Sequence, residues 1–81
     1  MTVTEALKLI VKYQDMKALN YAVNYAKYAL QIADQTGEEF RVQCLYVASN
    51  LSSWRATKSS SVTKEQIKEA RKAIKDAAGM K

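Results

Sequence analysis

Basic side chains in the last third of the chain recur at the spacing of one helix face. They follow an i, i+4, i+7, i+11 pattern with one close neighbour: Lys64, Lys68, Arg71, Lys75 and Lys72. Arg55 stands upstream, directly after the single tryptophan, Trp54. A row of this kind can neutralise phosphate groups or meet an acidic partner protein. These six basic residues are therefore the candidate anion-binding or nucleic-acid-binding set.

The net charge of the chain comes from this same region. Residues 1–54 contain five basic and five acidic residues, whereas residues 55–81 contain eight basic and three acidic ones, which accounts for the whole net charge of +5. A solvated helix face is the alternative interpretation, because lysines suit the C-terminal end of a helix and pairs such as Glu69 with Lys72 stabilise it locally. No aromatic residue interrupts the basic row, so base stacking is not indicated.

A second candidate surface is a row of tyrosines. Tyr21, Tyr25 and Tyr28 stand at i, i+4 and i+7, with Asn24 and Lys27 beside them. Tyrosine combines a large apolar ring with a hydroxyl that favours a wet edge, which suits protein interfaces. These five residues are the candidate partner-binding set, for another protein or for a second copy of the chain. The alternative is that the rings pack beneath a neighbouring helix.

Residue types needed for common catalytic sites are missing from the sequence. The chain has no His and one Cys, Cys44, so it lacks Ser–His or Cys–His nucleophile pairs, His-containing zinc sites and an internal disulfide. We expect no enzymatic activity, no metal and no cofactor. A weaker binding hypothesis is capture of small anionic nucleotides by Lys27, Arg41 or Arg55 with an aromatic ring.

The spacing of apolar residues predicts an all-α protein, a small bundle of three to four helices. The absence of Pro and the presence of only two Gly favour helix throughout. The helices are expected at residues 3–14, 16–35, 38–56 and 64–78. Thr2 with Glu5 and Thr63 with Gln66 have the spacing of capping boxes. Trp54 is expected to be the main core anchor.

Other local signals set the expected helix ends and the domain organisation. Asp15 can cap the second helix, Gly37 suits a left-handed stop after it, and Gly79 suits the end of the last. The Ser-rich stretch at residues 57–63 is expected to be a linker within a single domain, residues 1–81. With no long apolar run, no signal-peptide pattern and a lone Cys, we expect a cytoplasmic protein that does not enter a membrane.

Part of the sequence resembles a known group of proteins. The run Arg41-Val42-Gln43-Cys44-Leu45-Tyr46-Val47, followed by Trp54-Arg55, is its most specific part, and the similarity covers residues 19–55. This stretch resembles small helical proteins of bacteriophages and related mobile elements. The resemblance implies a compact helical protein without supplying an activity. Small phage proteins of this kind often act by binding a host or defence factor, a signalling molecule or DNA.

The leading hypothesis from the sequence is a non-enzymatic binding protein. It acts through protein–protein contacts at the tyrosine row, self-associates into a homo-oligomer, and inhibits a host or defence factor. The alternative is a nucleic-acid-binding accessory protein that uses the basic C-terminal helix. Capture of small anionic nucleotides is the third and weakest hypothesis.

Overall fold

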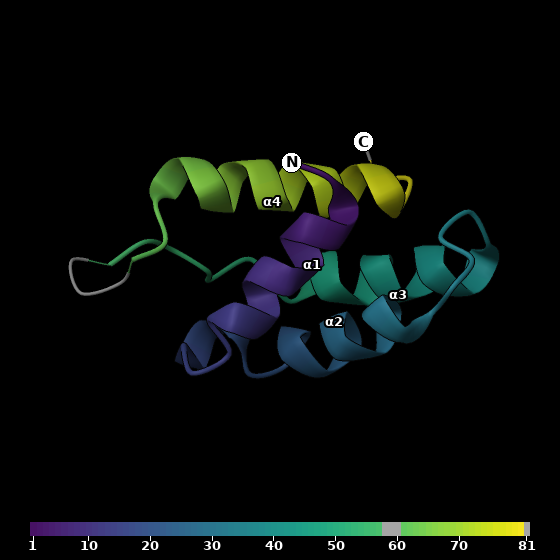
Figure 1. Ribbon diagram of the computed structural model, residues 1–81. Coiled ribbons are helices and arrows are strands. Elements are labelled where there is room, and N and C mark those ends of the chain that lie inside the picture. Colours follow the sequence, from purple (N-terminus) through teal and green to yellow (C-terminus); the bar gives the residue numbers. More distant parts are fainter. Residues whose placement is uncertain (58–60, 81) are drawn as a thin grey trace.

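The described part of the chain is built from helices and their connections. The computed structural model describes residues 1–57 and 61–80, and Figure 1 shows their arrangement. The elements are α1 (Val3–Lys12), a short 3-10 helix η1 (Lys17–Leu19), α2 (Ala22–Gln31), α3 (Glu38–Ser49) and α4 (Lys64–Ala77). The predicted fold class, a small all-α bundle, is confirmed.

Each of the four α-helices packs against two others. α2 contacts α1 and α3, and α4 contacts the same two helices. Figure 1 shows α4 running along α3 in the opposite direction, with α1 crossing between the level of α4 and the level of α2. α3 and α4 therefore lie side by side although residues 50–63 separate them along the chain.

The helices share one hydrophobic core. Its largest fully buried side chains come from α1, η1, α3, the turn after α3 and α4: Leu7, Ile10, Leu19, Phe40, Cys44, Val47, Leu51, Trp54 and Ile74. Trp54 has an exposed fraction of 0%, which confirms its predicted place in the core. No polar or charged residue in the described ranges is buried. No helix among the described residues is long and apolar enough to cross a membrane.

Side-chain caps fix where α1 and α4 begin. The Thr2 hydroxyl accepts from the Glu5 N–H at 3.1 Å, and the Glu5 carboxylate accepts from the Thr2 N–H at 2.8 Å. Thr63 and Gln66 make the same exchange at 3.1 and 2.9 Å. Gly79, which follows the C-cap residue Ala78 of α4, has a φ of 75°. Both predicted capping boxes and the predicted glycine stop of the last helix are confirmed.

The continuous helix predicted over residues 16–35 is wrong. The chain forms η1 first and then the shorter α2, which ends at Gln31 and is followed by Ile32, where the backbone is extended. The Asp34 carboxylate accepts from the backbone N–H of Thr36 at 3.0 Å and from its hydroxyl at 2.6 Å. Such local bonds compete with helix formation, and apolar periodicity does not reveal them. Asp15 is no cap either, since the N-cap of η1 is Met16, without a side-chain bond.

The third predicted helix, residues 38–56, begins as expected but ends at Ser49. The Ser49 hydroxyl donates to the Leu45 carbonyl and the Asn50 amide donates to the Tyr46 carbonyl, each at 2.8 Å. Polar side chains that bond back in this way favour helix ends. Gly37 is not the predicted left-handed stop, because its φ of −85° is ordinary and it serves as the N-cap of α3.

The other boundaries agree with the sequence more closely. The first predicted helix, residues 3–14, ends at Lys12, and the last, residues 64–78, ends at Ala77. The predicted Ser-rich linker at residues 57–63 is described only in part, since residues 58–60 lie outside the described ranges. Lys58 and Lys81, which contribute to the predicted charge of the C-terminal third, also lie outside them.

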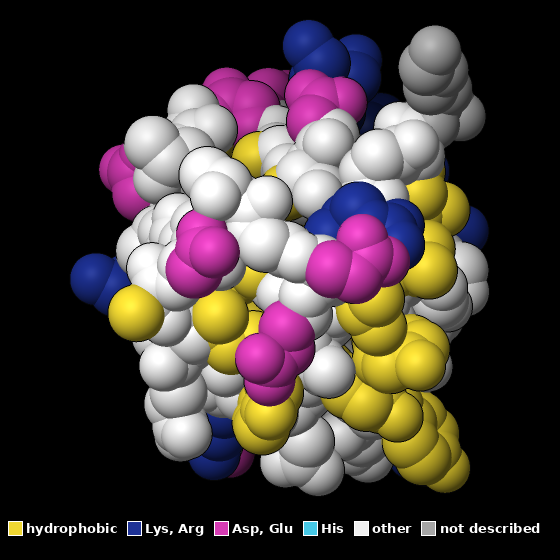
Figure 2. Space-filling view, turned by 90° about the vertical axis from the view of Figure 1, so that its right-hand side faces the viewer, with side chains coloured by type: hydrophobic (Ala, Val, Ile, Leu, Met, Phe, Trp, Pro, Cys, Tyr) yellow, Lys and Arg dark blue, Asp and Glu magenta, His cyan; other side chains and the backbone are white. Residues whose placement is uncertain are grey.

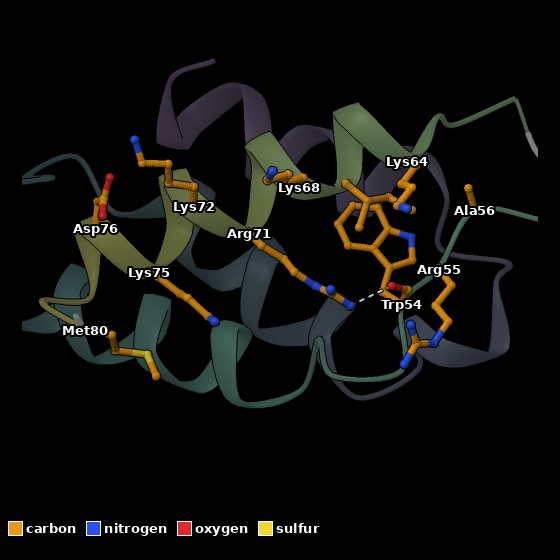
Figure 3. A pocket seen from close by; sticks show the side chains of 11 residues that line it. Trp54, Arg55, Ala56, Lys64, Lys68, Arg71, Lys72, Lys75, Asp76 and Met80 are labelled. Carbon is orange, nitrogen blue, oxygen red and sulfur yellow. Dashed lines mark hydrogen bonds between the residues drawn. The ribbon is translucent and has the colours of Figure 1, made fainter.

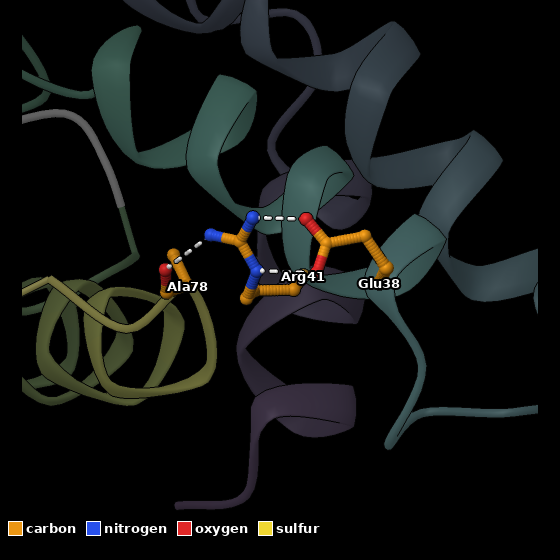
Figure 4. Close-up of polar contacts among 3 residues, drawn as sticks. All are labelled: Glu38, Arg41 and Ala78. Atoms are coloured by element: carbon orange, nitrogen blue, oxygen red, sulfur yellow. Dashed lines mark hydrogen bonds and ion pairs between the residues drawn. The ribbon is translucent and has the colours of Figure 1, made fainter.

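Arg41 joins the start of α3 to the end of α4. Figure 4 shows its guanidinium between the carboxylate of Glu38 and the backbone of Ala78. Nε donates to Glu38 Oε2 at 3.1 Å, Nη2 pairs with Glu38 Oε1, and Nη1 reaches the Ala78 carbonyl at 3.5 Å. The guanidinium holds the pKa of Glu38 below its usual value. Arg41 therefore has a structural use in this fold.

Burial of Cys44 predicts a pH-dependent stability. Desolvation raises the pKa of the thiol from 9.0 to about 11. The unfolded thiol ionises first as pH rises, so its contribution to the free energy of unfolding is complete below pH 9 and is lost between about pH 9 and 11. Urea unfolding across this range should show a steeper decline for the wild type than for Cys44→Ala. Equal slopes in the two proteins would contradict the prediction.

Candidate anion-binding groove and tyrosine surface

An open groove runs along α4 and past the segment that follows α3. Its volume is about 860 Å³. Its lining combines cationic and apolar side chains with one acid: Trp54, Arg55, Ala56, Lys64, Ile67, Lys68, Arg71, Lys72, Lys75, Asp76 and Met80. Figure 3 shows these side chains, with Trp54 and Arg55 at the end where α4 begins. We call this surface the basic groove.

The fold places the basic row of α4 along this groove. The capping box at Thr63 fixes the first residue of the helix, and Ile67, Ala70 and Ile74 are buried in the core. With that face turned inward, the basic residues are left along a solvent-facing edge. All six residues of the predicted anion-binding set line the basic groove. The sequence therefore identified its cations, although it did not reveal the hollow they surround.

The groove is strongly positive. Six of its lining residues are Lys or Arg, and Asp76 is the one acid among them. The ion pair found within the described ranges joins Arg41 to Glu38, away from the groove. Among the described residues, therefore, no carboxylate forms an ion pair with a lysine of the groove. Like charges gathered in a concave surface raise the local concentration of anions.

Arg71 differs from the other groove cations because the backbone uses its guanidinium. Nη2 donates to the carbonyls of Leu51 and Trp54, at 2.6 and 2.5 Å. These carbonyls lie in the turn after α3, so Arg71 pins that turn to α4. Sequence spacing assigned Arg71 to the anion-binding set, and the structure adds this positioning role. Helical periodicity could not predict this positioning role, because the bonded carbonyls are about 20 residues away along the chain.

Trp54 lies in the wall of the groove and is also a core residue. It is completely buried, and its indole Nε1–H has no hydrogen-bond partner among the described groups. An unpartnered buried donor is uncommon, because the lost hydrogen bond with water costs about 1–3 kcal/mol. Sequence reasoning placed Trp54 in the core and missed its position at the groove, as it missed Ile67 and Met80. In the sequence, the only sign that Trp54 lies near the groove is that the basic residue Arg55 follows it directly.

The predicted tyrosine row is exposed. Tyr21, Tyr25 and Tyr28 have exposed fractions of 78%, 39% and 47%. Tyr46 of α3, which the sequence did not assign to this set, is 45% exposed and packs its ring 5.2 Å from that of Tyr25. The Tyr28 hydroxyl donates to Glu39 at 2.7 Å, which raises the pKa of the phenol. The four rings are defined here as the tyrosine surface.

The two remaining residues of the predicted partner-binding set, and a band of hydrophobic side chains elsewhere on the molecule, are also exposed. Asn24 and Lys27 of the predicted partner-binding set are both exposed on α2. Figure 2 views the end of the molecule where α3 begins and α4 finishes; acidic side chains are spread over it, and a band of hydrophobic side chains follows one edge. Exposed apolar bands of this kind are frequent at protein contacts.

The three alternative cations of the nucleotide-capture hypothesis lie at different places in the structure. Arg55 lines the basic groove, whereas Lys27 and Arg41 do not. Arg41 is engaged by Glu38 and Ala78. In the described ranges no group of three or more His, Cys, Asp or Glu side chains could hold a metal ion. The basic groove, in contrast, brings all six residues of the predicted anion-binding set together in one hollow.

The double hydrogen bond of Arg71 predicts a stability effect. Arg71→Ala should lower the free energy of unfolding by about 2 kcal/mol, because a charged donor to two carbonyls is lost. The neighbouring Lys72→Ala removes the same charge from an exposed position and should change it by less than about 0.5 kcal/mol. Urea denaturation of both variants gives the comparison. Similar losses in the two would show that Arg71 does not pin the turn.

Comparison with known proteins adds no assignment to this geometry. No protein-family model, no curated protein and no solved structure matches the chain. What the groove and the tyrosine surface do must therefore be argued from their residues. The groove offers cations in a hollow, and the tyrosine surface offers aromatic rings on an open face.

Proposed function

We propose that the protein is a non-enzymatic binding protein whose basic groove takes the phosphate groups of nucleic acid. The observation that carries the proposal is that six cationic side chains line one groove and are opposed by a single acid. Phosphates are recognised by Lys and Arg without any requirement for a base sequence. The protein would then act as an accessory factor that covers a nucleic-acid backbone.

The dimensions of the row support a short backbone contact. Lys64 and Lys75 are eleven residues apart on α4, which corresponds to about 16 Å. Along the axis of a duplex, one strand carries a phosphate about every 3.4 Å, so the row spans the axial length of about five nucleotides. Trp54 is completely buried and offers no ring face for stacking. We expect weak binding that tolerates any sequence, with dissociation constants of about 1 to 100 µM.

Salt dependence tests this proposal. Fluorescence anisotropy with a labelled duplex should show affinity that falls as salt rises, with a log–log slope of about −4 for four to five phosphate contacts. The double variant Lys68→Gln with Lys72→Gln should bind more weakly and reduce the slope by about 2. Both side chains are exposed, so the fold should persist.

The matched control is the double variant Lys8→Gln with Lys17→Gln. These lysines are also exposed but do not line the groove, and the change in net charge is identical. The control should bind nearly as well as the wild type. Absence of binding by the wild type at low salt would overturn the proposal, and so would equal losses in the two double variants.

The tyrosine surface favours a second candidate function, contact with another protein. Its four rings are exposed or half-exposed, and those of Tyr25 and Tyr46 pack against each other; exposed aromatic residues are enriched at protein contacts. In this reading the chain self-associates or occupies the surface of a host or defence factor in the cytoplasm, as the resemblance to phage proteins suggests. The charge of the groove would then be secondary.

Self-association is the part of this candidate that can be tested on the purified chain. Light scattering after size exclusion should give a mass above that of the 9.1 kDa monomer, increasing with concentration. Tyr21→Ser with Tyr25→Ser should restore the monomer, whereas Asn24→Ser, on the same helix, should not. A wild type that stays monomeric at the highest concentration would exclude self-association.

A further inference from the structure

The indole N–H of Trp54 is a prepared donor at one end of the basic groove. The side chain is completely buried and lines the groove, yet Nε1–H has no partner in the described part of the chain. Indole nitrogen can only donate, so it needs an acceptor. A buried donor without an acceptor needs a physical explanation, and one explanation is that a ligand atom supplies the acceptor.

The surroundings of this donor are rigid and positively charged. Figure 3 shows the nitrogen-bearing edge of the indole turned toward Lys64 and Ala56, with Arg55 following in the chain. The Trp54 carbonyl is held by Arg71 at 2.5 Å, so the backbone that carries the ring is fixed. Lys64 is exposed and lines the same groove, so its ammonium group is available to an anion at this end of it.

The charges around the donor select the acceptor. Arg55 and Lys64 favour an anionic oxygen over a neutral carbonyl. Lys64 is also the first residue of α4, a helix of 14 residues, and the positive end of the helix dipole favours negative charge there. Glu65 in the same turn does not line the groove. A tetrahedral oxyanion can accept from the indole with one oxygen and contact both cations with the others.

We propose that this end of the groove is a discrete phosphate subsite formed by Trp54, Arg55 and Lys64. The inference rests on the proposed function and deepens it, because it fixes where one phosphate of the bound nucleic acid is held. The remaining lysines, from Lys68 to Lys75, then follow the neighbouring phosphates along α4. The phosphate is either the terminal group of a strand or an internal diester.

The indole resonance gives a direct test, since the chain has one tryptophan. Inorganic phosphate added to ¹⁵N-labelled protein at constant ionic strength should move the Trp54 indole N–H signal downfield in a saturable way. Chloride at the same ionic strength should not move it. Arg55→Gln should weaken the phosphate affinity about tenfold, whereas Lys8→Gln, outside the groove, should leave it unchanged.

A second variant removes the donor itself. Trp54→Phe keeps an aromatic ring in the core and deletes the N–H, and calorimetry should record a loss of phosphate affinity of about tenfold. If this variant unfolds, the Arg55→Gln titration decides alone. A wild-type indole signal unmoved by phosphate would overturn the subsite, as would unchanged affinity in Arg55→Gln.

Oligonucleotides separate the two sources of phosphate and separate this inference from the proposed function. A strand with a 5′-phosphate that shifts the indole, beside an unphosphorylated strand that does not, identifies a terminal group. Shifts with both strands identify an internal diester. Salt-dependent anisotropy without an indole shift refutes the subsite while the proposed function stands. An indole shift with inorganic phosphate but no binding of nucleic acid refutes the proposed function and supports the subsite.

Discussion

The attachment of the turn after α3 to α4 is the constraint on which the functional surface depends. Trp54 fills the core between these elements with its whole side chain buried, while Arg71 bonds the carbonyls of Leu51 and Trp54. The indole provides apolar burial and the guanidinium satisfies backbone acceptors at the edge of that core. Without this attachment, Arg55 and Ala56 would not be held opposite the lysines of α4. The groove thus follows from a core contact.

Charge segregation gives this groove its chemical character. The acidic residues of the last helix, Glu65 and Glu69, do not line it, and Asp76 is its single acid. The lysines along it have no carboxylate partner among the described residues, so their charge is available to a bound anion. The tyrosine surface is built differently, since the ring of Tyr25 on α2 packs against that of Tyr46 on α3. One small core therefore supports two surfaces with different chemistry.

The sequence predicted most of what depends on helical periodicity and local caps. The all-α fold, the capping boxes at Thr2 and Thr63, the burial of Trp54 and the alignment of the basic row all follow from spacing of 3.6 residues per turn. The predicted helix ends were wrong where polar side chains bond to nearby backbone, as at Asp34 and Asn50. Such bonds favour helix ends without changing the apolar pattern.

Long-range features could not be predicted for a different reason. The groove, the bonds of Arg71 and the pairing of Tyr25 with Tyr46 need the relative placement of helices, which one sequence does not supply. The sequence left open whether the tyrosine row is covered; with α2 packed against α1 and α3, the three rings are exposed. A helix with apolar residues around most of its circumference can have each apolar face either covered or exposed.

A map of backbone amide shifts on addition of a short DNA duplex tests the central claim most directly. The account predicts that the largest shifts fall on residues 54–56 and along α4 from Lys64 to Lys75, with little change around Tyr21 and Tyr25. Shifts concentrated at the tyrosine surface, or no shifts at low salt, would contradict the assignment of the basic groove as the site of phosphate binding.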